Sequence, residues 1–113
     1  MELTKILLVD DDDESKKNAR NFLENITHVS VVGDAIDSVD ALKKIEAHLP
    51  DVVLINNDLQ TVSVGEVVYL IKQRFPLIKV VIVTSEGSVN YSMLMDSVKA
   101  DGFILKSSFQ SAH

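Results

Sequence analysis

The sequence predicts an α/β fold, a doubly wound parallel sheet of five strands with helices on both faces. Five short apolar runs recur along its 113 residues, and segments with the apolar spacing of one helix face separate them. Each run is apolar almost throughout, which is typical of strands that are buried on both faces of a parallel sheet. Right-handed crossover connections then place the helices on alternate faces of that sheet.

Each expected strand is one of these apolar runs. They lie at residues 5–9, 29–32, 52–55, 79–84 and 102–106. Gly33 should stop the second strand, because glycine weakens a strand interior.

Four helices are expected between the strands. Their core faces are carried by Ala19, Phe22, Leu23 and Ile26 within residues 13–26; by Leu42, Ile45 and Leu49; by Val64, Val67, Val68, Ile71 and Phe75; and by the apolar side chains of residues 89–99. Pro50 and Pro76 should end the second and third helices, since proline lacks the N–H that a helix interior needs. The seven residues after Lys106 are too few for a fifth helix of three turns, so the final helix is expected to be missing.

Composition narrows the class of protein. A length of 113 residues fits one domain, residues 1–113. The formal net charge of −6 argues against a general nucleic-acid surface, which needs clustered lysine and arginine. No apolar run is long enough to span a membrane, and the first residues lack the pattern of an export signal. The absence of cysteine excludes disulfides and thiolate metal sites. A single soluble cytoplasmic domain is expected.

Polar side chains follow the expected strands at the point where each strand ends. In a parallel sheet of this kind, the functional site lies beyond the carboxyl ends of the strands. Asp10 and Asp11 follow the first strand, Thr84 ends the fourth and Lys106 ends the fifth. Two adjacent carboxylates suit Mg²⁺, and a cation, a hydroxyl and an ammonium group together would stabilise a phosphoryl group. The alternative is a solvated helix start, which accounts for residues 12–14 better than for the first two acids.

These motifs make the chain resemble a known family. The segments "KILLVDDD", "LPDVVLIN", "VVIVTS" and "KADGFILK" resemble the CheY-like receiver domains of two-component response regulators, and the similarity covers nearly the whole chain. The segment "VVGDAIDSVDALKKI" is most similar to receivers that carry LuxR-type helix-turn-helix output domains. The resemblance implies a flavodoxin-like fold with strand order 2-1-3-4-5. It also implies a function in phosphorelay signal transduction rather than in enzymatic turnover.

The resemblance implies a role for each site residue. Asp10 and Asp11 match the acidic pair that binds Mg²⁺, with Asp11 expected as the direct ligand. Thr84 matches the hydroxyl that moves onto the phosphoryl group, and Lys106 matches the lysine that pairs with that group. Phe103 matches the aromatic side chain that turns inward when the threonine moves. Each of these residues alone fits an ordinary structural role, whereas their joint arrangement favours the functional one.

Asn56 occupies the position where the family has its phosphoacceptor aspartate. An amide oxygen is uncharged and a poor nucleophile, so it cannot form the ordinary acyl phosphate. The loss of this carboxylate leaves Mg²⁺ with two acidic ligands instead of three, and metal binding should be weak or lost. The sequence therefore predicts a pseudo-receiver that acts through protein–protein interaction.

Two interpretations of Asn56 stay open. In the following segment "LQTVSVG", Gln60 stands where the family has proline and Thr61 where glycine is usual. Several departures in one loop favour natural divergence. The alternative is an engineered replacement of aspartate in a working receiver, which would regulate transcription through an output domain absent from this sequence.

Asp58 lies two residues beyond Asn56, so an extended chain would point both side chains the same way. It could serve as a displaced phosphoacceptor, or return negative charge to the metal site. In the family this position offers its backbone carbonyl to the metal. The alternative is a solvated loop acid.

Histidine kinases or other signalling proteins are the expected partners, with no membrane contact and no direct nucleic-acid binding by this domain. In the family, the fourth helix, fifth strand and fifth helix transmit the signal, which suggests a homodimer through the face of residues 89–106. A rival from the enzyme class is a small metal-dependent phosphatase with Asp10 or Asp11 as nucleophile. The segment "DDDDES" lacks the glycine and threonine of such enzymes, and that rival would require phosphate-ester turnover that Asp10→Ala abolishes.

Overall fold

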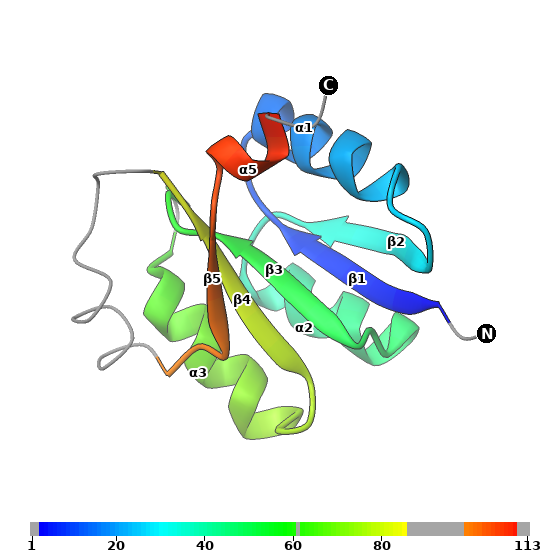
Figure 1. Ribbon diagram of the computed structural model, residues 1–113. Coiled ribbons are helices and arrows are strands. Elements are labelled where there is room, and N and C mark those ends of the chain that lie inside the picture. Colours follow the sequence, from blue (N-terminus) through cyan, green and yellow to red (C-terminus); the bar gives the residue numbers. More distant parts are fainter. Residues whose placement is uncertain (1–2, 61, 86–98, 111–113) are drawn as a thin grey trace.

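The sheet contains five parallel strands in the predicted order, β2-β1-β3-β4-β5 (Figure 1). The computed structural model describes residues 3–60, 62–85 and 99–110. The strands are β1 (Thr4–Val9), β2 (Val29–Ala35), β3 (Val52–Asn56), β4 (Lys79–Thr84) and β5 (Gly102–Leu105). Because β1 pairs with both β2 and β3, the strand order switches direction there. Sheets of this kind place their sites at the carboxyl ends around that switch point.

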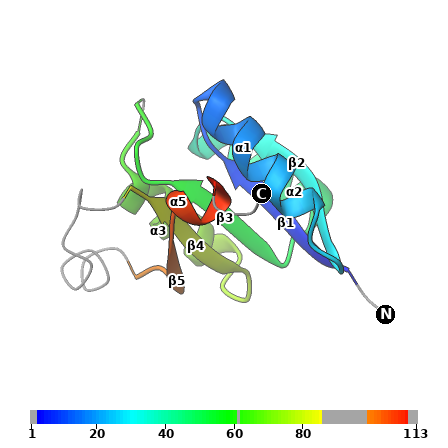
Figure 2. The ribbon, with the colours of Figure 1, turned by 45° about the horizontal axis from the view of Figure 1, so that its top comes forward.

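Helices cover both faces of the sheet. Figures 1 and 2 show α1 (Asp13–Glu24) and α5 (Ser107–Gln110) on one face, and α2 (Ser38–His48) and α3 (Val64–Arg74) on the other. The doubly wound arrangement confirms the predicted fold class. A separate hydrophobic core lies on each face. The α2/α3 core contains Leu7, Val9, Ala35, Ala41, Ile45, Val53, Ile55, Val67, Val68, Ile71, Ile78, Val80 and Ile82, and the smaller α1/α5 core contains Ile6, Leu8, Ala19, Leu23, Leu54 and Val83.

A polar side chain caps the start of each of the three longer helices. Asp12, Asp37 and Ser63 have an extended backbone, and each side chain accepts a hydrogen bond from the N–H three residues further on, at 2.7, 2.9 and 3.2 Å. Such caps satisfy N–H groups that have no partner inside the helix. The cap at Asp12 starts α1 directly after the acidic pair, so this pair lies at the junction of β1 and α1.

The second strand is longer than predicted, because Gly33 does not stop it. β2 continues two residues past this glycine. Its register against β1 shifts by one residue, since Ile6 pairs with Val31 whereas Leu7 pairs with Gly33. One residue of β2 is left over between these two pairs, which is the pattern of a β-bulge, and glycine in a strand is often found at such irregularities.

Two apolar residues that were predicted for helix core faces are exposed instead. Leu49 follows the last residue of α2 with φ 48° and ψ 60°, the left-handed conformation, and is 61% exposed. Ile26 lies beyond α1 and is 40% exposed. Both predictions were wrong because each helix ends before these residues, so the helical spacing that aligned them with the core does not extend to them.

The last segments differ from the prediction by small shifts. Residues 89–98 of the helix expected at 89–99 lie outside the described residues. Its last residue, Lys99, has a φ of 61°, which is not helical. β5 ends at Leu105, one residue before the predicted end. A single turn of four residues, α5, follows it in place of a helix of three turns. No helix in the described ranges is long and apolar enough to cross a membrane.

Candidate functional site

Adjacent strand ends bring the predicted site residues to one edge of the sheet. Asp10 directly follows β1, Asn56 ends β3 and Thr84 ends β4, and these residues are 5%, 4% and 0% exposed. The N–H of Asp10 donates to the carbonyl of Ala35 at 2.9 Å. Lys106 follows β5, and its backbone N–H donates to the carbonyl of Thr84 at 2.8 Å. Backbone hydrogen bonds between neighbouring strands therefore fix the positions of these residues at the edge of the sheet.

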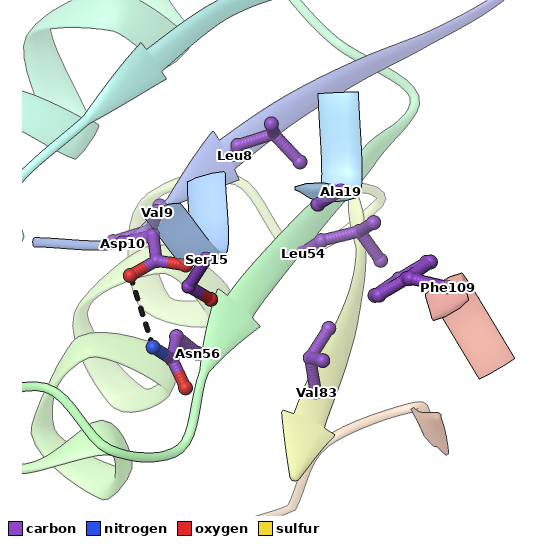
Figure 3. A pocket seen from close by; sticks show the side chains of 9 residues that line it. All are labelled: Leu8, Val9, Asp10, Ser15, Ala19, Leu54, Asn56, Val83 and Phe109. Atoms are coloured by element: carbon purple, nitrogen blue, oxygen red, sulfur yellow. Dashed lines mark hydrogen bonds between the residues drawn. The ribbon is translucent and has the colours of Figure 1, made fainter. Parts of the chain in front are cut away.

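The side-chain amide of Asn56 connects β3 to the end of β1. Its Nδ2 donates to Oδ1 of Asp10 at 2.9 Å (Figure 3). Its Oδ1 accepts a hydrogen bond from the backbone N–H of Asp58 at 3.1 Å. The reverse orientation would place oxygen against a carboxylate and –NH₂ against an N–H, so the two contacts together fix how the amide points. Both polar atoms of this buried group are satisfied, as a buried amide requires.

Backbone N–H groups supply further donors to the acidic pair. The N–H of Asp12 donates to Oδ1 of Asp10 at 2.9 Å. The N–H of Gln60 donates to Oδ2 of Asp11 at 2.8 Å, and Nε2 of Gln60 donates to the carbonyl of Asp58 at 3.0 Å. Each acid of the pair is therefore bound to β3 or to the loop between β3 and α3.

The same loop also contacts β4 and β5. Nζ of Lys106 lies 2.8 Å from Oδ2 of Asp58, whose side chain is 48% exposed, so water screens this ion pair in part. Nδ2 of Asn57 donates to Oγ1 of Thr84 at 3.4 Å, a long hydrogen bond. The N–H of Asn57 donates to the carbonyl of Val83 at 2.8 Å. The predicted lysine and threonine thus both contact this loop.

Phe103 lies within β5 and is partly buried. Its ring packs against the α2/α3 core. In the sheet Phe103 pairs with Ile82 of β4, and its role in a switch stays a prediction.

Two hollows adjoin the site on the α1/α5 face. A cavity of about 20 Å³ lies between α1, the sheet and α5; Figure 3 shows Asp10, Asn56 and Ser15 at one end of it and Phe109 at the other. That volume is enough for one water molecule. A larger cleft of about 200 Å³ is lined by Asp12, Glu14, Ser15, Asn18, Lys106 and Phe109.

Magnesium is the ion that the acidic residues predict, because Mg²⁺ prefers oxygen ligands. Within the described ranges, however, no three His, Cys, Asp or Glu side chains are grouped so that they could hold a metal ion. The carboxylates of Asp10, Asp11 and Asp58 each already accept a hydrogen bond from an N–H or ammonium group of the chain. As arranged, these residues do not fit a magnesium ion.

Sequence reasoning missed two contributors to this edge. The side chain of Asn57 was not assigned a role. Successive side chains of an extended strand point to opposite faces, so Asn57 was expected to point away from Asn56, and the sequence pattern did not indicate a partner for it. Gln60 was noted only as a departure from proline. The available signal was chemical: proline has no N–H, so any other residue there adds a donor close to the acidic pair.

Comparison with known proteins identifies the family. The profile of the response regulator receiver domain matches residues 6–112. The chain belongs to the response regulator receiver domain family. This receiver is 31% identical over 109 residues to the response regulator protein VraR of Staphylococcus epidermidis, covering 95% of this chain and 51% of VraR. It is 26% identical over 102 residues to the transcriptional regulatory protein DegU of Brevibacillus brevis, covering 90% of this chain and 43% of DegU. The receiver thus spans about half the length of these curated relatives, or less.

Solved structures resemble this receiver over most of its length. The signal receiver domain of NarL from Mycobacterium tuberculosis is 26% identical. Its TM-score is 0.78, and the match covers 94% of this chain and 86% of that one. A two-component response regulator of the LuxR family from Aurantimonas sp. SI85-9A1 has a TM-score of 0.82 over 93% of this chain and 75% of its own. At 24% identity, that second likeness supports the fold alone.

Proposed function

We propose that this receiver transmits its signal through contacts with other proteins and is not switched by ordinary aspartyl phosphorylation. The observation that carries the proposal is Asn56, buried at the carboxyl end of β3 and hydrogen-bonded to Asp10 at 2.9 Å. This is the place where a receiver's nucleophilic carboxylate would lie. An amide there cannot attack phosphorus to form an acyl phosphate, so it provides a structural contact only.

Histidine kinases or other signalling proteins are the proposed partners. The relatives VraR and DegU are about twice the length of this chain or more, and DegU is a transcriptional regulatory protein. Binding of nucleic acid would then be a property of a separate output domain, and the receiver itself would make no such contact. A homodimer through the face of β5 and residues 89–99 remains part of the proposal. A cytoplasmic location is part of the same proposal.

The test measures phosphate incorporation directly. The protein is incubated with acetyl phosphate and Mg²⁺, and its intact mass is recorded alongside that of Asn56→Asp. We expect no added phosphate on the unmodified chain. Phosphate on Asn56→Asp would mean that only the nucleophile is missing, whereas phosphate on the unmodified chain would contradict the proposal. Asp51→Asn, which removes an exposed carboxylate remote from the site, controls for non-specific modification.

A second candidate is a working receiver with Asp58 as a displaced acceptor. The ion pair between Lys106 and Asp58, at 2.8 Å, favours it, because this carboxylate has the lysine as neighbour and is 48% exposed. Under this alternative the unmodified chain gains one phosphate, and Asp58→Asn abolishes the gain. Retention of the phosphate in Asp58→Asn would exclude this residue as the acceptor.

A further inference from the structure

We infer that this receiver's acidic pair is held by N–H donors of its own chain in place of a divalent cation. The donors come from residues 56–60, the end of β3 and the start of the next loop, which we term the clasp. The inference rests on the proposed function and deepens it: the site is not only without its nucleophile but is closed in a form that does not depend on Mg²⁺.

The first donor is the amide of Asn56. Its Nδ2 lies 2.9 Å from Oδ1 of Asp10. A carboxylate at position 56 would place two negatively charged oxygens at about this separation in a buried site, which is strongly unfavourable unless a cation lies between them. The amide replaces that repulsion with a hydrogen bond to an ionised acceptor. The cation is then no longer needed to hold β1 and β3 together at this edge.

Gln60 supplies the second and third donors. Its backbone N–H donates to Oδ2 of Asp11 at 2.8 Å, and its Nε2 donates to the carbonyl of Asp58 at 3.0 Å. A proline at this position could make neither contact, because it has neither a backbone N–H nor an amide side chain. The three oxygens expected to face a metal, two carboxylates and one carbonyl, therefore each accept an N–H from the clasp.

The rest of the clasp fixes the loop to the other strand ends. Asn57 contacts Thr84 at the end of β4, and Asp58 contacts Lys106 after β5. The clasp is thereby attached to β1, β4 and β5 through its own side chains and backbone. A cation could enter only by replacing several of these hydrogen bonds at once, and those to Asp10 and Asp11 are charge-assisted.

The test measures Mg²⁺ binding in the absence of any phosphate donor. Backbone amide NMR signals of Asp12 and Asp58 in the full chain are followed during titration with MgCl₂. We expect the unmodified chain to need at least about tenfold more Mg²⁺ for half-saturation than the double variant Asn56→Asp/Gln60→Pro. The matched control is Asn56→Asp/Gln60→Ala, which loses the same side-chain amide but keeps the backbone N–H, and should bind Mg²⁺ more weakly than the proline variant. Equal binding by the unmodified chain and the proline double variant would overturn the inference.

A second measurement compares each protein with itself, in the absence and in the presence of Mg²⁺. The urea midpoint of the unmodified chain is measured in EDTA and in excess MgCl₂, and we expect the two midpoints to agree. For Asn56→Asp we expect a lower midpoint in EDTA that rises when Mg²⁺ is added, because binding to the folded state stabilises it. The inference would be overturned if Mg²⁺ raised the urea midpoint of the unmodified chain by as much as it raises the midpoint of Asn56→Asp.

These outcomes separate the inference from the proposed function. An unmodified chain that binds Mg²⁺ tightly but takes no phosphate would overturn the clasp and leave the proposed function standing. An unmodified chain that takes phosphate on Asp58 would contradict the proposed function, and the Mg²⁺ titration would then judge the clasp independently.

Discussion

At the scale of single residues, the contacts of this site depend on whether the group at position 56 donates or accepts a hydrogen bond. Asn56 differs from aspartate by one –NH₂ in place of one oxygen, yet that group is a donor facing Oδ1 of Asp10. A buried donor–acceptor pair is stabilising, whereas a buried pair of acceptors is costly. At Gln60 a donor is gained rather than reversed, because a proline there would have no N–H to donate to Asp11. Two local changes in hydrogen-bonding capacity therefore act on one acidic pair.

Asp101 provides a residue-scale prediction about pH. Burial raises the pKa of its carboxyl group, but the hydrogen bond from the N–H of Val80, the hydrogen bond and charge of Lys72 and the charge of Lys79 outweigh burial and hold the pKa below its usual value of 3.8. The contacts themselves are 2.8 Å to Val80 and 2.9 Å to Lys72. Because the folded-state pKa is lowered, the stabilisation is fully present above the unfolded pKa and is lost as pH falls through the folded pKa.

We expect Asp101→Asn to lower the free energy of unfolding by about 1 kcal/mol near neutral pH, since partial exposure screens the charge. The difference between wild type and variant should shrink as the pH is lowered from about 6 to below about 3. Urea unfolding across that range measures it. Glu46→Gln is the control, because the ion pair of Glu46 with Arg74 is exposed. A difference that is the same at every pH would contradict the assignment.

Residue-scale sequence reasoning predicted which side chains lie at the edge where the strands end, and it missed the contacts that depend on hydrogen-bond geometry. Asp10, Thr84 and Lys106 were predictable, because the carboxyl ends of neighbouring parallel strands share one edge. The contacts of Asn57 and the backbone N–H of Gln60 were not, because they depend on how the loop turns after β3. No periodic pattern in the sequence reports that turn.

At the scale of elements, capping side chains mark where the helices begin, and the errors of the prediction lie at the ends of helices and strands. The extents of β4 and α3 followed from apolar runs and from Pro76, which lies just beyond α3. The exposure of Leu49 and the continuation of β2 past Gly33 were not predicted. The spacing of side chains does not indicate where a left-handed residue ends a helix, as at Leu49, or where a bulge interrupts a strand, as next to Gly33. Element type was therefore more predictable than element ends.

Asp37 offers the element-scale prediction. Its side chain accepts the N–H of Asp40 at 2.9 Å and caps α2. We expect Asp37→Ala to reduce the free energy of unfolding by about 1 kcal/mol, because that N–H would lose its acceptor. Asp37→Asn keeps a capping oxygen and should lose much less. Urea unfolding of the three proteins makes the comparison, and equal losses in the two variants would mean that the cap is not the cause.

At the scale of the whole molecule, the two faces of the sheet are packed unequally. The largest fully buried apolar side chains, including Leu7, Ile55 and Ile82, all belong to the α2/α3 core. In the described residues, the opposite face is covered by α1 and the single turn of α5. The ring of Phe109 in α5 lies edge-on to the ring of Phe22 in α1, with the ring centroids 5.2 Å apart. Phe109 also lines the cavity of about 20 Å³ on this face. Side chains on this face therefore have less closely packed surroundings.

Leu7 and Leu8 test this asymmetry with one residue type. They are neighbours on β1, 0% and 2% exposed, and belong to the α2/α3 and α1/α5 cores respectively. We expect Leu7→Ala to lower the free energy of unfolding by about 4 kcal/mol, because closely packed surroundings cannot relax into the space left behind. Leu8→Ala should lower it by only about 2–3 kcal/mol, since Leu8 already borders the cavity and the single turn of α5 can move toward it. Urea unfolding of both variants measures the difference. Equal losses would mean that the two faces contribute alike, and that α1 and the single turn of α5 pack their face as tightly as α2 and α3 pack theirs.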